Sequence, residues 1–264
     1  MLEYFRDNQW FINQYWPENE PRVQTVLSDL ARLVPKGSSV FDPGCGNGYI
    51  SFLASRIGYK VVATDAWSPP DREELFRRAD IDFFPSNLNV DNPWPNIVDQ
   101  SFEAVLFGEV FEHLLNHPVG LLIQIRRVLK PGGVLLLTTP NPSTLVNAVR
   151  VLLDRHSLWG TEEFANTQKI IDGKVIDRGE IHYREYRSTE LCACLTRAGF
   201  RVESSGYLYL GSPPTHRLKW LLKRMLGPLM RARLLATCNY MIASTGSVEG
   251  NRATPIAEAS RSPS

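Results

Sequence analysis

The feature that most constrains this chain is a glycine-rich loop that follows a short apolar segment. Residues 40–48 read VFDPGCGNG, so an apolar stretch leads to Asp42 and then to glycines at alternate positions. Glycine lets the backbone turn tightly and lets a ligand approach it without interference from a Cβ atom. A strand that ends in such a loop and continues as a helix is typical of ligand binding at the carboxyl edge of a parallel sheet.

Apolar segments alternate with amphipathic ones along the chain, which predicts a sheet with helices on both faces. The predicted strands are 39–41, 60–64, 81–84, 102–107, 134–139, 200–209 and 234–243. The predicted helices are 20–33, 47–56, 118–129 and 188–198, the last with Ser188 as its N-cap and Gly199 as its stop. Strands as apolar as 102–107 and 134–139 indicate burial on both faces. The fold class is therefore α/β, with a doubly wound parallel sheet.

The glycine spacing and Asp42 distinguish the loop from a dinucleotide site. Such a site has the spacing G-x-G-x-x-G, whereas this chain has Tyr49 at the position of the last glycine. A carboxylate at Asp42 would repel a pyrophosphate but suits a cationic ammonium group. Asp65 ends the next predicted strand, where a carboxylate can accept hydrogen bonds from ribose hydroxyls.

At these residues the chain resembles the class I S-adenosylmethionine-dependent methyltransferases. The resemblance covers 38–140 closely and 182–243 loosely, and includes RRVLKPGGVLLLTTPN at 126–141. It implies a Rossmann-like, seven-stranded, mostly parallel sheet whose last strand is antiparallel. It also implies S-adenosylmethionine as the cofactor. The implied cofactor contacts are Asp42, Gly44, Cys45 and Gly46 for the methionine part, Asp65 for the ribose, Ala66 or Trp67 with Asn87 and Leu88 for the adenine, and Glu109.

A cluster of acids and a histidine follows the predicted strand at 102–107. Glu109, Glu112 and His113 are spaced i, i+3 and i+4, so one helical turn would place them on one face. His182 begins a second segment, HYREY at 182–186. The two patterns resemble ubiquinone-biosynthesis O-methyltransferases and small-RNA terminal 2′-O-methyltransferases, which use a metal. That resemblance implies Glu109, Glu112, His113 and His182 as ligands of Mg²⁺ or another divalent cation.

Other roles for this cluster stay open. Methyl transfer to a hydroxyl requires the acceptor to lie close to the donor and to lose its proton. His113 or His182 could act as the general base without a metal, because histidine titrates near neutral pH. The candidate catalytic residues are therefore His113, His182 and Glu109. In the plainest interpretation, Glu109 only contacts the cofactor, Glu112 forms a surface pair and His113 packs.

Charge narrows the range of partners. The chain has 29 basic and 28 acidic residues, a formal charge of +1, so it lacks the basic excess that is typical of nucleic-acid-binding proteins. The segment 217–233 nevertheless carries six basic residues and no acid, with leucines near one helical face. It predicts a basic amphipathic helix that packs on the sheet or contacts an anionic membrane.

Four scattered cysteines and the lack of an apolar run of 18 residues predict a cytoplasmic protein with reduced thiols. We expect one methyltransferase domain over 1–243 and a disordered tail over 244–264. The domain is divided into a helical cap rich in aromatic residues (1–34), a cofactor-binding core (38–140), a lid or insertion (141–187) and the rest of the sheet (188–243).

The expected activity is O-methylation of a small molecule, such as a sugar, a glycolipid or a quinone-type phenol. The acceptor could therefore be lipid-linked. Three alternatives remain open: an RNA 2′-O-methyltransferase, an NAD-dependent oxidoreductase, and a non-catalytic methyltransferase-like binding protein.

Overall fold

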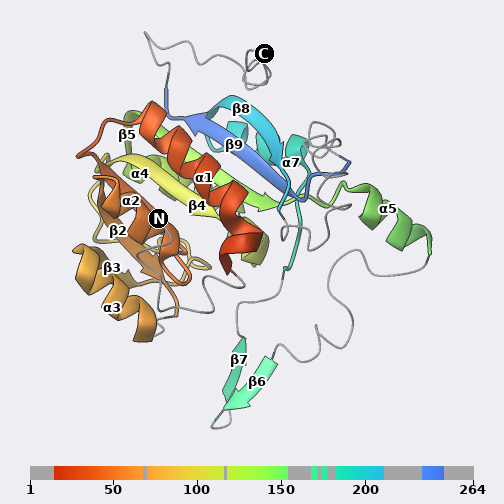
Figure 1. The fold of residues 1–264 in the computed structure, drawn as a ribbon, viewed down its shortest axis with the longest axis horizontal. Coiled ribbons are helices and arrows are strands. Elements are labelled where there is room, and N and C mark those ends of the chain that lie inside the picture. The colour runs from red at the N-terminus through yellow and green to blue at the C-terminus, as the bar shows by residue number, and fades with distance from the viewer. Residues whose placement is uncertain are drawn as a thin grey trace.

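Seven strands form one central sheet in the computed structural model of the chain (Figure 1). The structure describes residues 15–67, 70–115, 118–153, 168–171, 174–177, 182–210 and 234–246. The strands of the sheet are β1 (Ser39–Pro43), β2 (Lys60–Asp65), β3 (Asp82–Pro85), β4 (Phe102–Gly108), β5 (Leu129–Pro140), β8 (Arg201–Leu208) and β9 (Cys238–Ser244). Their order is β3-β2-β1-β4-β5-β9-β8. Strands β1 to β5 are parallel, and β9 is antiparallel to both of its neighbours. The predicted fold class is thereby confirmed.

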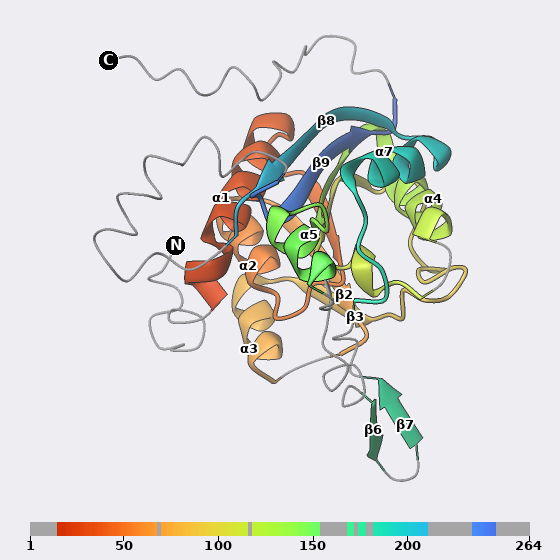
Figure 2. The same cartoon turned by 90° about the vertical axis from the view of Figure 1, so that its right-hand side faces the viewer.

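Helices cover both faces of this sheet (Figure 2). One face packs against α1 (Trp16–Leu33), α2 (Tyr49–Arg56) and α3 (Pro70–Ala79), and the other against α4 (Pro118–Val128) and α7 (Ser188–Arg197). Successive strand residues point to opposite faces, so Val40 joins the first core while Phe41 joins the second. Burial on both faces explains why the central strands are apolar throughout.

The remaining described elements lie within the predicted lid. Helix α5 (Leu145–Leu152) has Thr144 as its N-cap, whose hydroxyl accepts the N–H of Asn147. None of its residues is buried, and Figure 1 shows it standing away from the sheet. Strands β6 (Gln168–Ile171) and β7 (Lys174–Asp177) form a separate antiparallel pair.

Several boundaries differ from the sequence prediction. The helix predicted from 47 begins at Tyr49, because Gly48 adopts φ +75° as its N-cap. Arg187 rather than Ser188 caps α7, and its N–H donates to the Glu190 carboxylate. The strand predicted from 234 begins at Cys238 and continues to Ser244, so the predicted tail starts too early. Thr245, which lies in the predicted tail, is held at the sheet because its N–H donates to the Gly133 carbonyl.

Other predictions fall outside the described residues. These are residues 1–14 of the N-terminal cap, the lid residues 154–167, 172–173 and 178–181, the basic segment 217–233 and the tail beyond 246. Within the described part of the chain, no helix combines the length and the apolar character that crossing a membrane requires. All four cysteines are free thiols.

The strand order places the glycine loop at a crevice in the sheet. The chain runs outward from β1 through β2 to β3 and then returns to form β4 on the other side of β1. At the carboxyl ends of β1 and β4, the loops that follow the two strands therefore lead away in opposite directions. In open α/β sheets, ligands bind at this switch point.

Candidate active site

Three glycines shape the loop after β1. Gly44, Gly46 and Gly48 have φ values of +79°, +55° and +75°, a region that other residues rarely adopt. At Gly48 a Cβ atom would lie 2.4 Å from the Phe76 ring, so the loop packs tightly there. At Gly46 a Cβ atom would meet nothing within 4 Å, so a ligand can approach that backbone.

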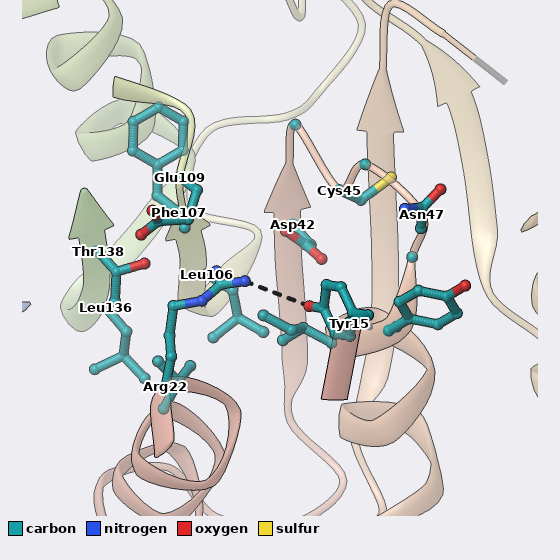
Figure 3. A pocket seen from close by; sticks show the side chains of 17 residues that line it. Tyr15, Arg22, Asp42, Cys45, Asn47, Leu106, Phe107, Glu109, Leu136 and Thr138 are labelled. Atoms are coloured by element: carbon teal, nitrogen blue, oxygen red, sulfur yellow. Dashed lines mark hydrogen bonds between the residues drawn. The ribbon is translucent and has the colours of Figure 1, made fainter. Parts of the chain in front are cut away.

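A cavity of about 190 Å³ lies above this loop. In Figure 3, Asp42 lies at the end of β1, Cys45 and Asn47 come from the loop, and Glu109 and Thr138 lie on the opposite side. Arg22 reaches in from α1, and Tyr15 reaches in from the position just before that helix. The full set of lining residues is Tyr15, Arg22, Val26, Asp42, Gly44, Cys45, Gly46, Asn47, Gly48, Tyr49, Ile50, Leu106, Phe107, Gly108, Glu109, Leu136 and Thr138. Five of the residues predicted to contact the cofactor are thus in the cavity wall: Asp42, Gly44, Cys45, Gly46 and Glu109.

Asp42 is a buried carboxyl group at the end of β1. Its Oδ2 accepts a hydrogen bond of 2.5 Å from the Ser51 hydroxyl. Burial raises the pKa of Asp42 to about 6, although the hydrogen bond from Ser51 lowers it. A cation in the cavity would favour the ionised form, because opposite charges stabilise a carboxylate.

Asp65 is not among the residues that line the cavity, and its carboxylate accepts hydrogen bonds from two backbone segments beside the loop. Its Oδ2 accepts the N–H of Gly46 at 2.8 Å, and its Oδ1 accepts the N–H of Trp67 at 3.0 Å. Arg72, a buried residue of α3, donates to the Gly46 carbonyl at 2.6 Å and lies 3.9 Å from Asp65. Each carboxylate oxygen has a second lone pair, so Asp65 can still accept hydrogen bonds from a ligand.

The predicted adenine contacts lie beyond the described cavity wall. Ala66 is exposed just after β2. The Oδ1 atom of Asn87 accepts the N–H of Asn89 at 2.9 Å, and Leu88 packs against the second core. These residues follow β2 and β3, so they share the carboxyl edge of the sheet with the cavity but do not line it.

One cavity residue from α1, Arg22, was not predicted. Arg22 is buried and donates to Asn19 at 2.8 Å and to the Tyr15 hydroxyl at 3.4 Å. Burial alone would lower the pKa of Arg22, but Tyr15 and Glu109 raise it, so the guanidinium stays charged. The available signal was helical spacing, because Arg22 lies four residues before Val26 on the apolar face of α1.

Glu109 lies in the turn between β4 and the acid–histidine cluster. It has φ +56°, a strained value for a residue with a side chain. Its N–H donates to the Thr138 carbonyl at 2.9 Å, and its Oε1 accepts a weak hydrogen bond from the Cys238 thiol at 3.5 Å. The side chain therefore faces the cavity rather than the two histidines.

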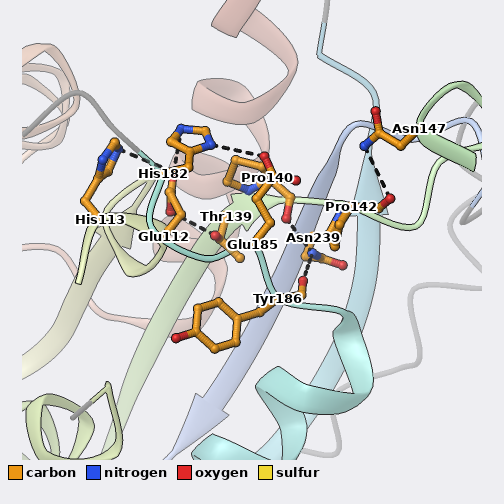
Figure 4. A network of polar contacts seen from close by, with 10 residues as sticks. All are labelled: Glu112, His113, Thr139, Pro140, Pro142, Asn147, His182, Glu185, Tyr186 and Asn239. Atoms are coloured by element: carbon orange, nitrogen blue, oxygen red, sulfur yellow. Dashed lines mark hydrogen bonds and ion pairs between the residues drawn. The ribbon is translucent and has the colours of Figure 1, made fainter. Parts of the chain in front are cut away.

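The cluster itself contains Glu112, His113 and His182 (Figure 4). One ligand atom from each lies within 4.8 Å of the others. The Oε1 atom of Glu112 lies 3.8 Å from Nε2 of His113 and 3.9 Å from Nε2 of His182. The structure therefore brings together three of the four predicted metal ligands, and Glu109 is not part of this group.

Glu112 is the most buried member of the cluster, with 1% of its surface exposed. Its Oε2 accepts a hydrogen bond of 2.8 Å from the Thr139 hydroxyl, whereas its buried Oε1 has no hydrogen-bond partner. Burial raises the pKa of Glu112 well above its ordinary value, and the nearby Glu109 carboxylate raises it further. The prediction of Glu112 as a surface residue is therefore wrong, because the short helix η3 (Phe111–His113) turns this side chain inward.

The segment that carries His182 is held by its backbone. The N–H groups of Tyr183 and Arg184 both donate to the Glu112 carbonyl, at 2.9 and 3.3 Å. The Asn239 amide on β9 donates to the Tyr186 carbonyl at 2.9 Å. Residues more than 50 positions apart in the sequence are thereby placed against each other, which no local pattern could indicate.

This donor set fits a divalent cation. A carboxylate oxygen and imidazole nitrogens are common metal ligands, and the buried Oε1 of Glu112 lacks the partner that such an atom normally has. Two ligands of one cation at about 2.1 Å each can lie at most about 4.2 Å apart. The separations of 3.8 and 3.9 Å satisfy that limit.

Comparison with known proteins agrees with this architecture. The methyltransferase domain family matches residues 15–205. The ubiquinone biosynthesis O-methyltransferase of Xanthomonas axonopodis pv. citri is 32% identical over 212 residues, which cover 75% of this chain and 80% of that protein. The corresponding protein of Xanthomonas campestris pv. campestris (strain B100) is 29% identical over 212 residues, with the same coverage.

Solved structures share the fold at low sequence identity. The 1,6-didemethyltoxoflavin-N1-methyltransferase of Burkholderia thailandensis, solved with bound S-adenosylhomocysteine, has a TM-score of 0.55 and 15% identity, covering 93% of this chain and 87% of that one. A SAM-dependent methyltransferase from Archaeoglobus fulgidus has a TM-score of 0.53 and 17% identity, covering 88% and 99%. The family match spans most of the chain and decides against the NAD-dependent oxidoreductase. The chain belongs to the class I S-adenosylmethionine-dependent methyltransferases.

Proposed function

We propose that this methyltransferase acts on an oxygen of a small molecule and uses a divalent cation held by Glu112, His113 and His182. The observation that carries the proposal is the position of this cluster beside the cavity. Adjacent residues of β5 contribute to both, because Thr138 lines the cavity and the Thr139 hydroxyl donates to Glu112. The relatives named ubiquinone biosynthesis O-methyltransferases support an oxygen as the acceptor atom.

The cavity suits the amino-acid end of S-adenosylmethionine. Asp42 would hold the ammonium group, and Arg22 would hold the carboxylate, since these are a buried acid and a buried cation of the same wall. Asp65 would accept the ribose hydroxyls. The cofactor supplies a methyl group on a sulfonium centre, and these residues would orient it for in-line transfer.

The cluster would serve the acceptor rather than the cofactor. A bound divalent cation lowers the pKa of a hydroxyl that it contacts. Glu112 would supply the negative charge of the site, and the two histidines would supply neutral nitrogen ligands or remove the proton. Such a site favours hydroxyl acceptors over amines, since an amine does not need to be ionised.

A lipid-linked acceptor is supported by the surface of α5. Val149 and Leu152 are 45% and 84% exposed, and Arg150 is the only charged residue of this helix. The helix follows β5, the strand that holds Glu112 through Thr139. Exposed apolar side chains next to a basic side chain such as Arg150 are suited to contact with an anionic lipid surface. The composition of 217–233, with six basic residues and no acid, points to the same partner.

The competing acceptor is an RNA 2′-hydroxyl. The formal charge of +1 disfavours it, because RNA binding normally requires a basic surface. Retention of an RNA oligonucleotide at 150 mM salt, roughly physiological ionic strength, would support this alternative instead.

A metal-dependence assay tests the proposal. Methyl transfer to a panel of catechol and sugar hydroxyls is measured before and after EDTA treatment, and again after adding Mg²⁺ or Mn²⁺. We expect EDTA to abolish turnover and the metal to restore it, and Glu112→Gln to lose activity by at least about 100-fold. Glu190→Gln, which removes an acid that pairs with Arg184 and Arg187, is the control and keeps its activity. Full activity in EDTA and in Glu112→Gln would contradict the proposal.

A further inference from the structure

Glu185 is a carboxylate that lies behind His182, on the side away from Glu112. Its Oε1 atom lies 3.1 Å from Nδ1 of His182, while Nε2 of the same ring points toward Glu112 (Figure 4). The Glu185 side chain is only 11% exposed, so the contact is sheltered from water. This glutamate was not among the predicted site residues.

We propose that Glu185 is a positioning residue that fixes the tautomer of His182 and so makes Nε2 a metal ligand. A carboxylate oxygen 3.1 Å from Nδ1 is placed to accept a hydrogen bond from that nitrogen, so this contact favours the tautomer with the proton on Nδ1. In a neutral imidazole the lone pair then lies on Nε2, the nitrogen that faces the cluster. This inference rests on the proposed function of the cluster as a cation site.

The geometry around Nε2 agrees with this assignment. Nε2 lies 3.9 Å from Oε1 of Glu112, which is too long for a hydrogen bond. If Nε2 carried the proton, it could donate to this oxygen, which is buried without a hydrogen-bond partner. With the proton on Nδ1, the Nε2 lone pair lies on the side of the ring that faces Glu112. A cation between the two atoms would satisfy the buried Oε1 of Glu112 and lie within reach of Nε2.

The backbone of this segment does not depend on Glu185. Tyr183 and Arg184 are held by the Glu112 carbonyl, and Tyr186 by the Asn239 amide. A substitution at Glu185 therefore removes the partner of Nδ1 while the chain that carries His182 keeps its hydrogen bonds. Carboxylates that orient ligating histidines typically change metal affinity by 10- to 100-fold.

The first measurement is Mn²⁺ binding, followed by electron paramagnetic resonance, in the metal-free full chain. We expect Glu185→Ala to weaken Mn²⁺ binding by about 10- to 100-fold. Glu185→Gln should be intermediate, because its amide oxygen can still accept from Nδ1. The control Glu190→Gln, an acid of the neighbouring helix that pairs with arginines, keeps the wild-type affinity. Equal Mn²⁺ affinity in wild type and Glu185→Ala would overturn the proposal.

The second measurement needs no metal and separates this inference from the proposed function. Nitrogen-15 chemical shifts of the His182 ring report which nitrogen carries the proton. We expect Nδ1–H in the wild type and a shift toward Nε2–H in Glu185→Ala. An unchanged His182 tautomer in Glu185→Ala would overturn the positioning role, whether or not Mn²⁺ binds. If wild type binds no Mn²⁺ while the tautomer does shift, the metal part of the proposed function fails and the positioning role stands.

Discussion

At the scale of single residues, the raised pKa of Asp42 predicts that cofactor binding depends on pH. Burial raises its pKa to about 6, so the carboxyl group becomes neutral as the pH falls through this value. An ammonium group in the cavity needs the ionised form, and a ligand that binds only this form loses up to tenfold in affinity per pH unit below the pKa. We expect the Kd of S-adenosylmethionine, measured by calorimetry from pH 8 to pH 5, to rise below pH 6.

Two variants separate this effect from other titrating groups. Asp42→Asn should bind weakly at every pH, with no rise in Kd near pH 6. Ser51→Ala removes the hydrogen bond that favours the ionised carboxylate, so the rise should begin at a higher pH than in the wild type. A pH dependence in Asp42→Asn identical to that of the wild type would show that another group is responsible.

The residues that the sequence revealed are those with a local signature. Asp42 and Gly46 follow a strand in a fixed pattern, and the structure places both in the cavity wall. Arg22 and Arg72 were missed because their roles depend on how α1 and α3 pack over the loop. The apolar spacing of α1 predicts which face is buried, but it does not predict that this face ends in a cavity.

At the scale of elements, α5 is unusual because it is rich in large aliphatic residues and none of its residues is buried. Its valines and leucines face solvent although an isolated eight-residue helix gains little stability from its own hydrogen bonds. We expect the protein to sediment with vesicles that contain phosphatidylglycerol and to sediment less with phosphatidylcholine alone. A double variant, Val149→Ser with Leu152→Ser, should lose most of this binding, because it removes apolar surface without changing charge.

The matched control for this prediction is Ile123→Ser on α4. Ile123 is also a half-exposed aliphatic residue, with 48% of its surface accessible, but it lies on a different helix. It should therefore keep the vesicle binding of the wild type. If the double variant sediments with the vesicles as fully as the wild type, or if the wild type does not bind anionic vesicles, α5 does not contact lipid.

The sequence predicted helices and strands correctly where an apolar pattern marks them, and it missed elements or boundaries that depend on tertiary contacts or strand pairing. The five strands with continuous apolar runs in the first half were all found. Helix α3 was not, because Leu75 and Phe76 are the only large apolar residues in a charged segment. Strand β5 starts at Leu129, before the predicted 134, since it pairs with Phe102 across an irregularity in β4. Strand order itself came from family resemblance, because periodicity does not say which strands are neighbours.

At the scale of the whole molecule, the cavity joins segments that are far apart in the sequence. Its wall runs from Tyr15 at the start of α1 to Thr138 on β5, through the ends of β1 and β4. A ligand bound there contacts only the folded state, so it stabilises the entire domain. At a concentration of 100 Kd this stabilisation is about 2.7 kcal/mol. For a domain of this size, 1 kcal/mol shifts the unfolding temperature by about 2 to 4 °C.

S-adenosylhomocysteine at 100 Kd should therefore raise the Tm, followed by circular dichroism, by about 5 to 10 °C. NAD⁺ at the same concentration should leave it unchanged, because Asp42 repels a pyrophosphate and Tyr49 occupies the place of the last dinucleotide glycine. Arg22→Leu should reduce the shift, since it removes the cavity cation that we propose binds the carboxylate of the ligand, whereas Glu190→Gln on α7 should show the full shift. A larger Tm shift with NAD⁺ than with S-adenosylhomocysteine would mean that the cavity recognises phosphate rather than a zwitterionic amino acid.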